Sequence, residues 1–196
     1  MIQFISIIAG LFNFVAGASY LKQIFKNEST PNPSTWIVVM VVSIINAATY
    51  LAVVEETPWI ALSSWVTALM VSLIFITSLF RGKFTKLNQV DITCLVLAVI
   101  IGVFWQLSAN ALVSNISLQV IFIIAFYPTI NGLLKGGGKE RAFSWTLGSC
   151  SYILQILNIL LNPVILWALV FPIIQLIGQG TIALLAYSQS HENHKI

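Results

Sequence analysis

Seven long apolar segments, separated by short polar stretches, dominate this sequence of 196 residues. They cover residues 2–21, 35–54, 59–80, 91–108, 115–134, 142–161 and 164–188. A helix needs about 20 residues to cross the hydrocarbon core of a bilayer. Each segment is close to that length, so the sequence predicts an all-α membrane protein with seven transmembrane helices.

The low content of charged residues supports this class. Only 8% of the residues are charged and 58% are hydrophobic, whereas a soluble domain carries about 25% charged residues. Such a chain cannot cover a soluble surface, so a lipid bilayer is its expected partner. No basic stripe accompanies the charges, and nucleic-acid binding is therefore not expected.

The basic residues all fall on one side of the predicted topology. The segments 22–34, 81–90 and 135–141 and the C-terminal tail share that side, and they contain all nine Lys and Arg residues. The opposite side carries Glu55 and Glu56 but no basic residue. Because basic loops stay in the cytoplasm, we expect the N-terminus outside and the C-terminus inside, in a plasma membrane or a bacterial inner membrane.

Two polar hinges indicate an internal repeat. The first reads YLKQIFKNESTPNPSTW and starts at Tyr20, and the second reads YPTINGLLKGGGKERAFSW and starts at Tyr127. Each passes through a Lys and a turn-rich loop and ends at a Trp preceded by Ser or Thr. Trp36 in the first hinge thus corresponds to Trp145 in the second.

The next boundary repeats as well. TPWIAL at 57–62 is similar to NPVILW at 162–167, and each places a Pro at the expected first turn of a helix, where its missing N–H costs nothing. We therefore expect a first three-helix repeat at 1–86, a linker helix at 87–110, and a second three-helix repeat with a short tail at 111–196.

This 3+1+3 pattern, with a polar hinge at the cytoplasmic end of helices one and five, resembles the SWEET and PQ-loop superfamily of transporters. The resemblance implies two parallel three-helix bundles with a solute site near the midplane between them. PQ-loop members usually have Pro-Gln at the hinge, of which the first hinge here keeps Gln23 and the second keeps Pro128. The hinge or gate residues implied by the resemblance are Tyr20, Gln23, Tyr127 and Pro128.

Polar residues within the apolar segments are candidates for the solute path, because such residues tend to face a bundle interior or an aqueous cavity. Asn46 and Gln155 lie near mid-span at corresponding places in the two repeats. Their amides both donate and accept hydrogen bonds, which suits a neutral polyol-like or zwitterionic ligand. The alternative role for such residues is packing between membrane helices.

The resemblance implies that Asn and Trp residues of the second helix in each repeat hold a sugar. The two hinge Trp residues are equally compatible with a belt at the membrane interface. The predicted substrate-binding residues are Asn13, Trp36, Asn46, Trp145, Gln155, Asn158 and Gln175.

The acidic residues favour passive transport. All of them lie at the end of a predicted segment or in a loop, and His191 and His194 lie in the tail. Proton-driven carriers usually need a titratable group within the membrane. We therefore expect a facilitative uniporter that works by alternating access on a small, neutral, polar solute, with a mono- or disaccharide as the leading class.

Two other functions fit the same topology. One is a PQ-loop-type carrier of amino acids or of a vitamin, and the other is a non-transporting membrane receptor, and a homo-oligomer is possible for each. An enzyme is not expected, because no segment combines a nucleophile with a base or contains a metal-binding cluster. Neither a cofactor nor a metal is expected.

Overall fold

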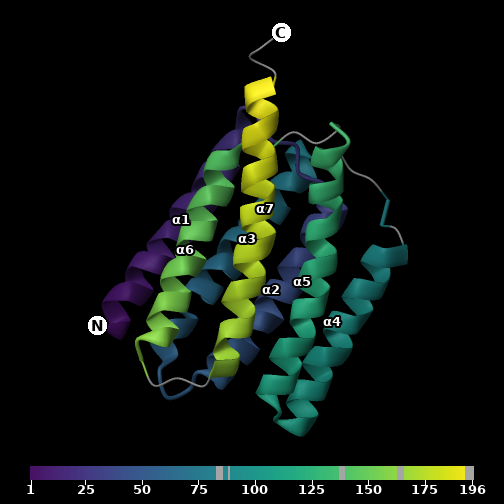
Figure 1. The fold of residues 1–196 in the computed structure, drawn as a ribbon. Helices are drawn as coiled ribbons and strands as arrows, with labels where there is room; N and C mark the ends of the chain where they lie inside the picture. The colour runs from purple at the N-terminus through teal and green to yellow at the C-terminus, as the bar shows by residue number, and fades with distance from the viewer. Residues whose placement is uncertain (83–85, 88, 137–139, 163–165, 193–196) are drawn as a thin grey trace.

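The computed structural model describes residues 1–82, 86–87, 89–136, 140–162 and 166–192, with side chains up to residue 190. This described part is built from helices and contains no strand (Figure 1). The long helices are α1 (Ile2–Phe25), α2 (Pro33–Val53), α3 (Leu62–Arg81), α4 (Gln89–Ser108), α5 (Ala111–Leu134), α6 (Ala142–Leu160) and α7 (Val170–Glu192). Short 3₁₀ turns, η1 (Pro58–Ala61) and η2 (Leu166–Leu169), directly precede α3 and α7.

The helices begin where the sequence supplies N-terminal caps. Asn32 Oδ1 accepts a hydrogen bond of 3.1 Å from the backbone N–H of Ser34, and Pro33 occupies the first turn of α2. Asn110 accepts from the backbone N–H of Val113 at the start of α5. Each bond satisfies one of the backbone donors that a helix leaves free at its start. Pro58 begins η1 as the sequence indicated, and its counterpart Pro163 lies outside the described residues.

Six helices in the described part are long and apolar enough to cross a membrane. They are Ile2–Phe25, Pro33–Val53, Pro58–Arg81, Gln89–Ser108, Ala111–Leu134 and Leu166–Ser190. α6 has 19 residues but is not one of the six. Its sequence includes Ser144, Ser149, Ser151, Gln155 and Asn158, all buried, and these lower its hydropathy. The chain is thus a multi-pass membrane protein by helix length and composition, and a seventh crossing by α6 remains a proposal.

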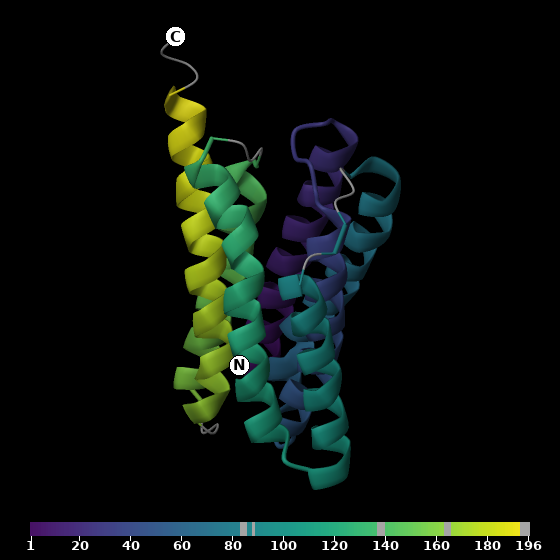
Figure 2. The ribbon, with the colours of Figure 1, turned by 90° about the vertical axis from the view of Figure 1, so that its right-hand side faces the viewer.

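The helices around the centre form a closed ring. In the ring α1 packs against α3 and α6, α2 packs against α3 and α5, and α7 packs against α5 and α6. α4 lies outside the ring and contacts α2 and α5. Figure 2 shows α5, α6 and α7 on one side, α1, α2 and α3 on the other, and α4 in the foreground.

The two ends of the ring differ in charge. We call the end where α1, α3 and α5 finish the basic end, because Lys22, Lys26, Arg81, Lys86, Lys135 and Arg141 lie in or next to its turns. The C-terminal part of α7 extends beyond this end, and the N-terminus lies toward the opposite, acidic end with Glu55 and Glu56 (Figure 1). Lys83, Lys139 and Lys195 lie outside the described residues.

Aromatic side chains fill the ring toward the acidic end. Phe171 on α7 packs against Tyr50 on α2 and Tyr152 on α6, with ring centroids 5.0 and 5.6 Å apart. The Tyr50 hydroxyl donates to the backbone carbonyl of Ala168 at 3.0 Å. All three rings are completely buried, so this cluster closes the interior of the ring from the acidic end.

Candidate functional site

A cavity of about 240 Å³ lies inside the ring, and a smaller one of about 80 Å³ adjoins it. They share five lining residues, which are Trp36, Thr67, Val71, Trp145 and Gln179. We call the two together the central cavity. Drug-sized ligands occupy pockets of about 300–1,000 Å³, and the two parts together lie at the lower limit of that range, so the central cavity suits a small molecule.

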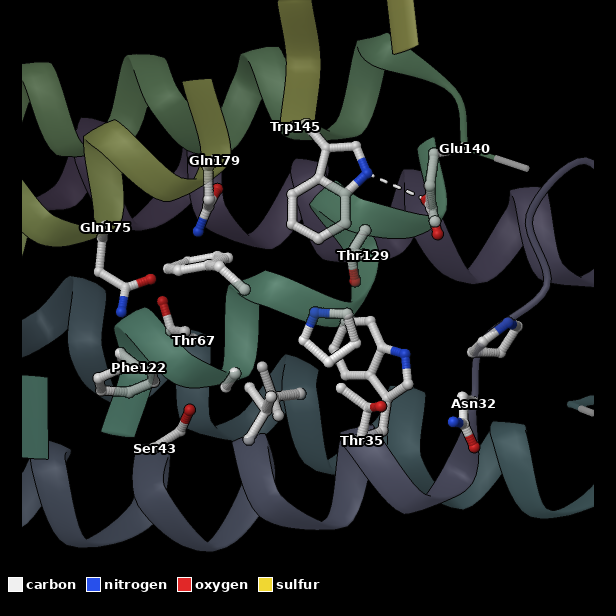
Figure 3. A pocket seen from close by; sticks show the side chains of 18 of the residues that line it. Asn32, Thr35, Ser43, Thr67, Phe122, Thr129, Glu140, Trp145, Gln175 and Gln179 are labelled. Atoms are coloured by element: carbon white, nitrogen blue, oxygen red, sulfur yellow. Dashed lines mark hydrogen bonds between the residues drawn. The ribbon is translucent and has the colours of Figure 1, made fainter. Parts of the chain in front are cut away.

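The inner end of the central cavity is polar. Ser43 on α2, Thr67 on α3 and Gln175 on α7 line it, and Figure 3 shows them at one end of the cavity. Ser43 Oγ and Gln175 Nε2 are buried and have no hydrogen-bond partner within the described residues. Because an unpaired buried polar group costs about 1–3 kcal/mol, such groups favour a ligand that supplies the missing partners.

The end of the cavity toward the basic end contains a carboxylate. Glu140 lies just before α6 and lines the cavity, and Figure 3 shows Trp145 beside it and Asn32 across the cavity at the same end. It accepts hydrogen bonds from the hydroxyl of Tyr20 at 2.9 Å and from Trp145 Nε1 at 3.1 Å. A longer bond of 3.4 Å comes from the hydroxyl of Ser29. A residue of the loop between α5 and α6 therefore reaches into the ring interior.

The surroundings of Glu140 favour its neutral form. Burial raises the pKa of this carboxyl group to about 7, although the hydrogen bonds from Trp145, Tyr20 and Ser29 act in the opposite direction. A carboxyl group with a pKa near neutrality changes its charge in the physiological range. The central cavity thus contains a titratable group.

Side-chain hydrogen bonds connect α1 to α6 and the residues just before it at the basic end. Besides the bond from Tyr20 to Glu140, Gln23 Nε2 donates to Ser144 Oγ at 2.8 Å. In addition, Arg141 forms an ion pair with Glu28, in which Nε and Oε2 are 3.8 Å apart. The predicted hinge residues Tyr20 and Gln23 therefore connect α1 to the start of α6.

Hydrogen bonds between amide side chains connect α2 to α5. Asn46 Oδ1 accepts from Asn115 Nδ2 at 3.1 Å and from Gln119 Nε2 at 2.9 Å. Asn115 Nδ2 also donates to the hydroxyl of Thr49. Asn46 is only 1% exposed and does not line the central cavity, so here it joins two helices.

Gln155 and Asn158 also lie away from the central cavity. Gln155 Nε2 donates to the backbone carbonyl of Ile60 at 3.2 Å, and Gln155 Oε1 has no partner in the described part of the chain. Asn158 Nδ2 donates to Ser6 Oγ at 2.9 Å and to the carbonyl of Ile2. Both side chains connect α6 to neighbouring segments.

The remaining predicted site residues divide between cavity and surface. Trp36, Trp145, Gln175 and Pro128 line the larger part of the central cavity, and Asn13 and Tyr20 line the smaller part. Asn13 Nδ2 also donates to Thr67 Oγ1 at 3.0 Å. Tyr127 is 65% exposed and contributes to a separate pocket beside α4.

The predicted binding residues omit several side chains that line the cavity, among them Glu140, Thr67 and Ser43. By sequence Glu140 is one of the loop acids, and only its position five residues before Trp145 connects it to the hinge pattern. Ser43 is a single hydroxyl in an apolar run, one turn from Asn46, and no residue type or spacing distinguishes it from a packing serine.

Within the described residues, no group of three or more His, Cys, Asp or Glu side chains lies together in the way that a metal site requires. Comparisons with known protein families, with curated proteins and with solved structures found no match. The function must therefore be inferred from the cavity itself.

Proposed function

We propose that this chain is a membrane carrier for a small polar solute that binds in the central cavity. The observation behind this proposal is a polar cavity enclosed by helices whose outer surfaces suit lipid. Two buried polar atoms there, Ser43 Oγ and Gln175 Nε2, have no hydrogen-bond partner among the residues that the structure describes. Polar groups inside a membrane bundle are costly and mark solute paths. A solute hydroxyl group that bonds to either atom supplies its missing partner.

The proposed architecture has two three-helix units, at 1–86 and 111–196, joined by a linker helix at 87–110. Three sets of contacts support it: α1 and α2 both pack on α3, α5 and α6 both pack on α7, and α4 touches one helix of each unit. A 3₁₀ turn also precedes the third helix of each unit. The positive-inside rule places the basic end in the cytoplasm, with seven crossings including α6.

The proposed mechanism is alternating access between these units. The central cavity extends from Gln175 toward the turn of Pro31 and Asn32 at the basic end, whereas Tyr50, Tyr152 and Phe171 close the acidic end. A carrier needs a second state in which the aromatic cluster separates and the residues near Trp36 close together. No ion gradient is part of this uniport scheme.

A sugar is the first solute class to test. Trp36 and Trp145 line both parts of the central cavity, where flat apolar rings can pack against a sugar. Ser43 and Gln175 can exchange hydrogen bonds with sugar hydroxyl groups.

The test is solute counterflow in liposomes that contain the purified protein, with radiolabelled glucose and sucrose and no ion gradient. We expect wild-type uptake that is lowered at least tenfold in Ser43→Ala and in Gln175→Leu, which remove the two unpaired groups. Ser117→Ala, which removes an exposed hydroxyl that bonds only to its own helix, is the matched control. Absence of uptake of both sugars would contradict the sugar assignment.

A further inference from the structure

The described residues that line the central cavity provide a negative charge but no positive one. Glu140 is the one carboxylate among its described lining residues, and those residues include no Lys, Arg or His. A solute with its own carboxylate would meet no basic partner there, and an unpaired buried charge is costly. The cavity therefore favours a positively charged group over a negative one.

The residues around this carboxylate are aromatic. Trp145 donates to Glu140, and Trp36 lines both parts of the cavity. Tyr20 lies between them, with ring centroids 5.3 Å from Trp36 and 5.7 Å from Trp145. Aromatic faces attract ammonium groups, most strongly where water is excluded.

Glu140 can accept a further partner. A carboxylate has about four acceptor positions, and its described donors are the hydroxyl of Tyr20, the hydroxyl of Ser29 and Nε1 of Trp145. None of these donors is charged. The neighbouring Arg141 is paired with Glu28, so the charge of Glu140 has no described cationic partner.

From this geometry we infer that the solute carries an ammonium group, which binds against Glu140 beside Trp36 and Trp145, while its hydroxyl groups reach Ser43 and Gln175. The solute class is then a small amino alcohol or amino sugar. This inference depends on the proposed carrier function, because it concerns the solute of the same cavity. It adds an ammonium group to the hydroxyl-bearing solute proposed above, so an amino sugar should bind more tightly than the neutral sugar of the same shape.

The test is equilibrium binding of two isosteric probes to the purified full chain in lipid nanodiscs. Choline carries a permanent positive charge, and 3,3-dimethyl-1-butanol has the same shape without the charge. We expect choline to bind at least tenfold more tightly than the neutral alcohol. In Glu140→Gln choline affinity should fall at least tenfold, and the affinity of the neutral alcohol should stay unchanged.

A second measurement uses the wild-type protein, so that it does not depend on the folding of a variant. Because the pKa of Glu140 is about 7, the ionised fraction falls from roughly nine-tenths at pH 8 to roughly one-tenth at pH 6. The charge of choline does not change over this range. We expect choline binding to weaken about tenfold between pH 8 and pH 6, while binding of the neutral alcohol is constant.

The outcomes separate this inference from the carrier proposal. Equal affinity of the two probes, or pH-independent binding of choline, overturns the ammonium site. The same pH dependence for both probes also overturns it, because Glu140 would then act through the contact between α1 and α6. Choline that binds but does not cross liposomes in the presence of the protein supports the site and contradicts the carrier function.

Discussion

The hydroxyl of Tyr20 donates a hydrogen bond of 2.9 Å to Oε1 of Glu140, across a sequence separation of 120 residues. The bond joins the end of α1 to the start of α6. It also fixes the carboxylate at the edge of the central cavity, because Trp145 holds Oε2 of the same group from the α6 side. This pair of residues therefore links the two halves of the ring and also holds the carboxylate that lines the central cavity.

Removal of this bond should change the titration of Glu140. The bond favours the ionised carboxylate and lowers the pKa of Glu140 relative to burial alone. In Tyr20→Phe we therefore expect the pKa of Glu140 to rise further above its ordinary value. The infrared carbonyl band of the protonated carboxyl group, followed against pH, measures this shift directly. Tyr127→Phe is the control, since Tyr127 is 65% exposed, and an equal shift in both variants would contradict the assignment.

The stability of the protein should depend on pH through Glu140. Its folded-state pKa of about 7 lies above its ordinary value of 4.5, so the folded state binds the proton more tightly than the unfolded state. The stabilising contribution is complete at pH below 4.5 and is lost as pH rises through 7. We expect the melting temperature in detergent to fall between pH 5 and pH 8.

Glu140→Gln is the matched variant for this pH dependence, because it keeps the shape of the side chain and removes the titration. It should flatten the change in melting temperature over the same range. A wild-type melting temperature that stays constant from pH 5 to pH 8 would show that ionisation of Glu140 does not destabilise the folded state.

Two residues one turn apart on α2 should respond in opposite ways. Asn46→Ala leaves the amide donors of Asn115 and Gln119 without their shared acceptor, which should cost about 1–3 kcal/mol of folding free energy. Ser43→Ala removes a buried hydroxyl that has no partner in the described part of the protein, so it relieves the cost of an unpaired polar group and should leave the protein at least as stable as wild type. The affinity of the Ser43→Ala variant for the solute should fall instead.

Thermal unfolding and solute binding, measured on both variants, test this pair. If Asn46→Ala is as stable as wild type and also loses solute binding, Asn46 has the binding role that the sequence suggested. In that case the amide group between α2 and α5 turns toward the solute in another state of the ring.

Glycine at position 17 should be required for the packing of α1 on α3. A Cβ atom there would lie 2.6 Å from Cβ of Met70. This distance is too short for two carbon atoms, so the backbone of one helix would have to move away. We expect Gly17→Ala to destabilise the protein by about 1–3 kcal/mol. In Gly102→Ala the new Cβ meets Ile45 Cδ1 at 3.4 Å, an ordinary contact, so this control should be neutral or slightly stabilising. Equal melting temperatures of the two variants would argue against close packing at Gly17.

Apolar length and basic residues in the sequence predicted the helices with few errors. The segment expected at 35–54 is α2 at Pro33–Val53, and the segment expected at 91–108 is α4 at Gln89–Ser108. α5 begins four residues earlier than expected, at Ala111, because the Asn110 side chain caps it and Ser114 and Asn115 turn inward. Hydropathy alone places such polar residues outside a span.

The site was harder to predict, because residue type does not say which face of a helix a side chain occupies. Asn46 and Ser43 share α2, but the amide bonds to α5 and the hydroxyl lines the cavity. Glu140 is in a loop by sequence, and its place in the cavity depends on Tyr20, from a helix 120 residues earlier. Both outcomes depend on contacts between distant segments, which a local pattern does not encode.

The proposed carrier function requires Ser43 to lie in a cavity that solute reaches from both sides of the membrane. The most direct measurement is labelling of Ser43→Cys in liposomes with a membrane-impermeant thiol reagent, in a background with Cys94 and Cys150 replaced by Ala. We expect labelling from the side of the basic end and, more slowly, from the acidic end, with choline protecting in both cases. Labelling from neither side contradicts the carrier function, and labelling that choline does not slow contradicts the ammonium site.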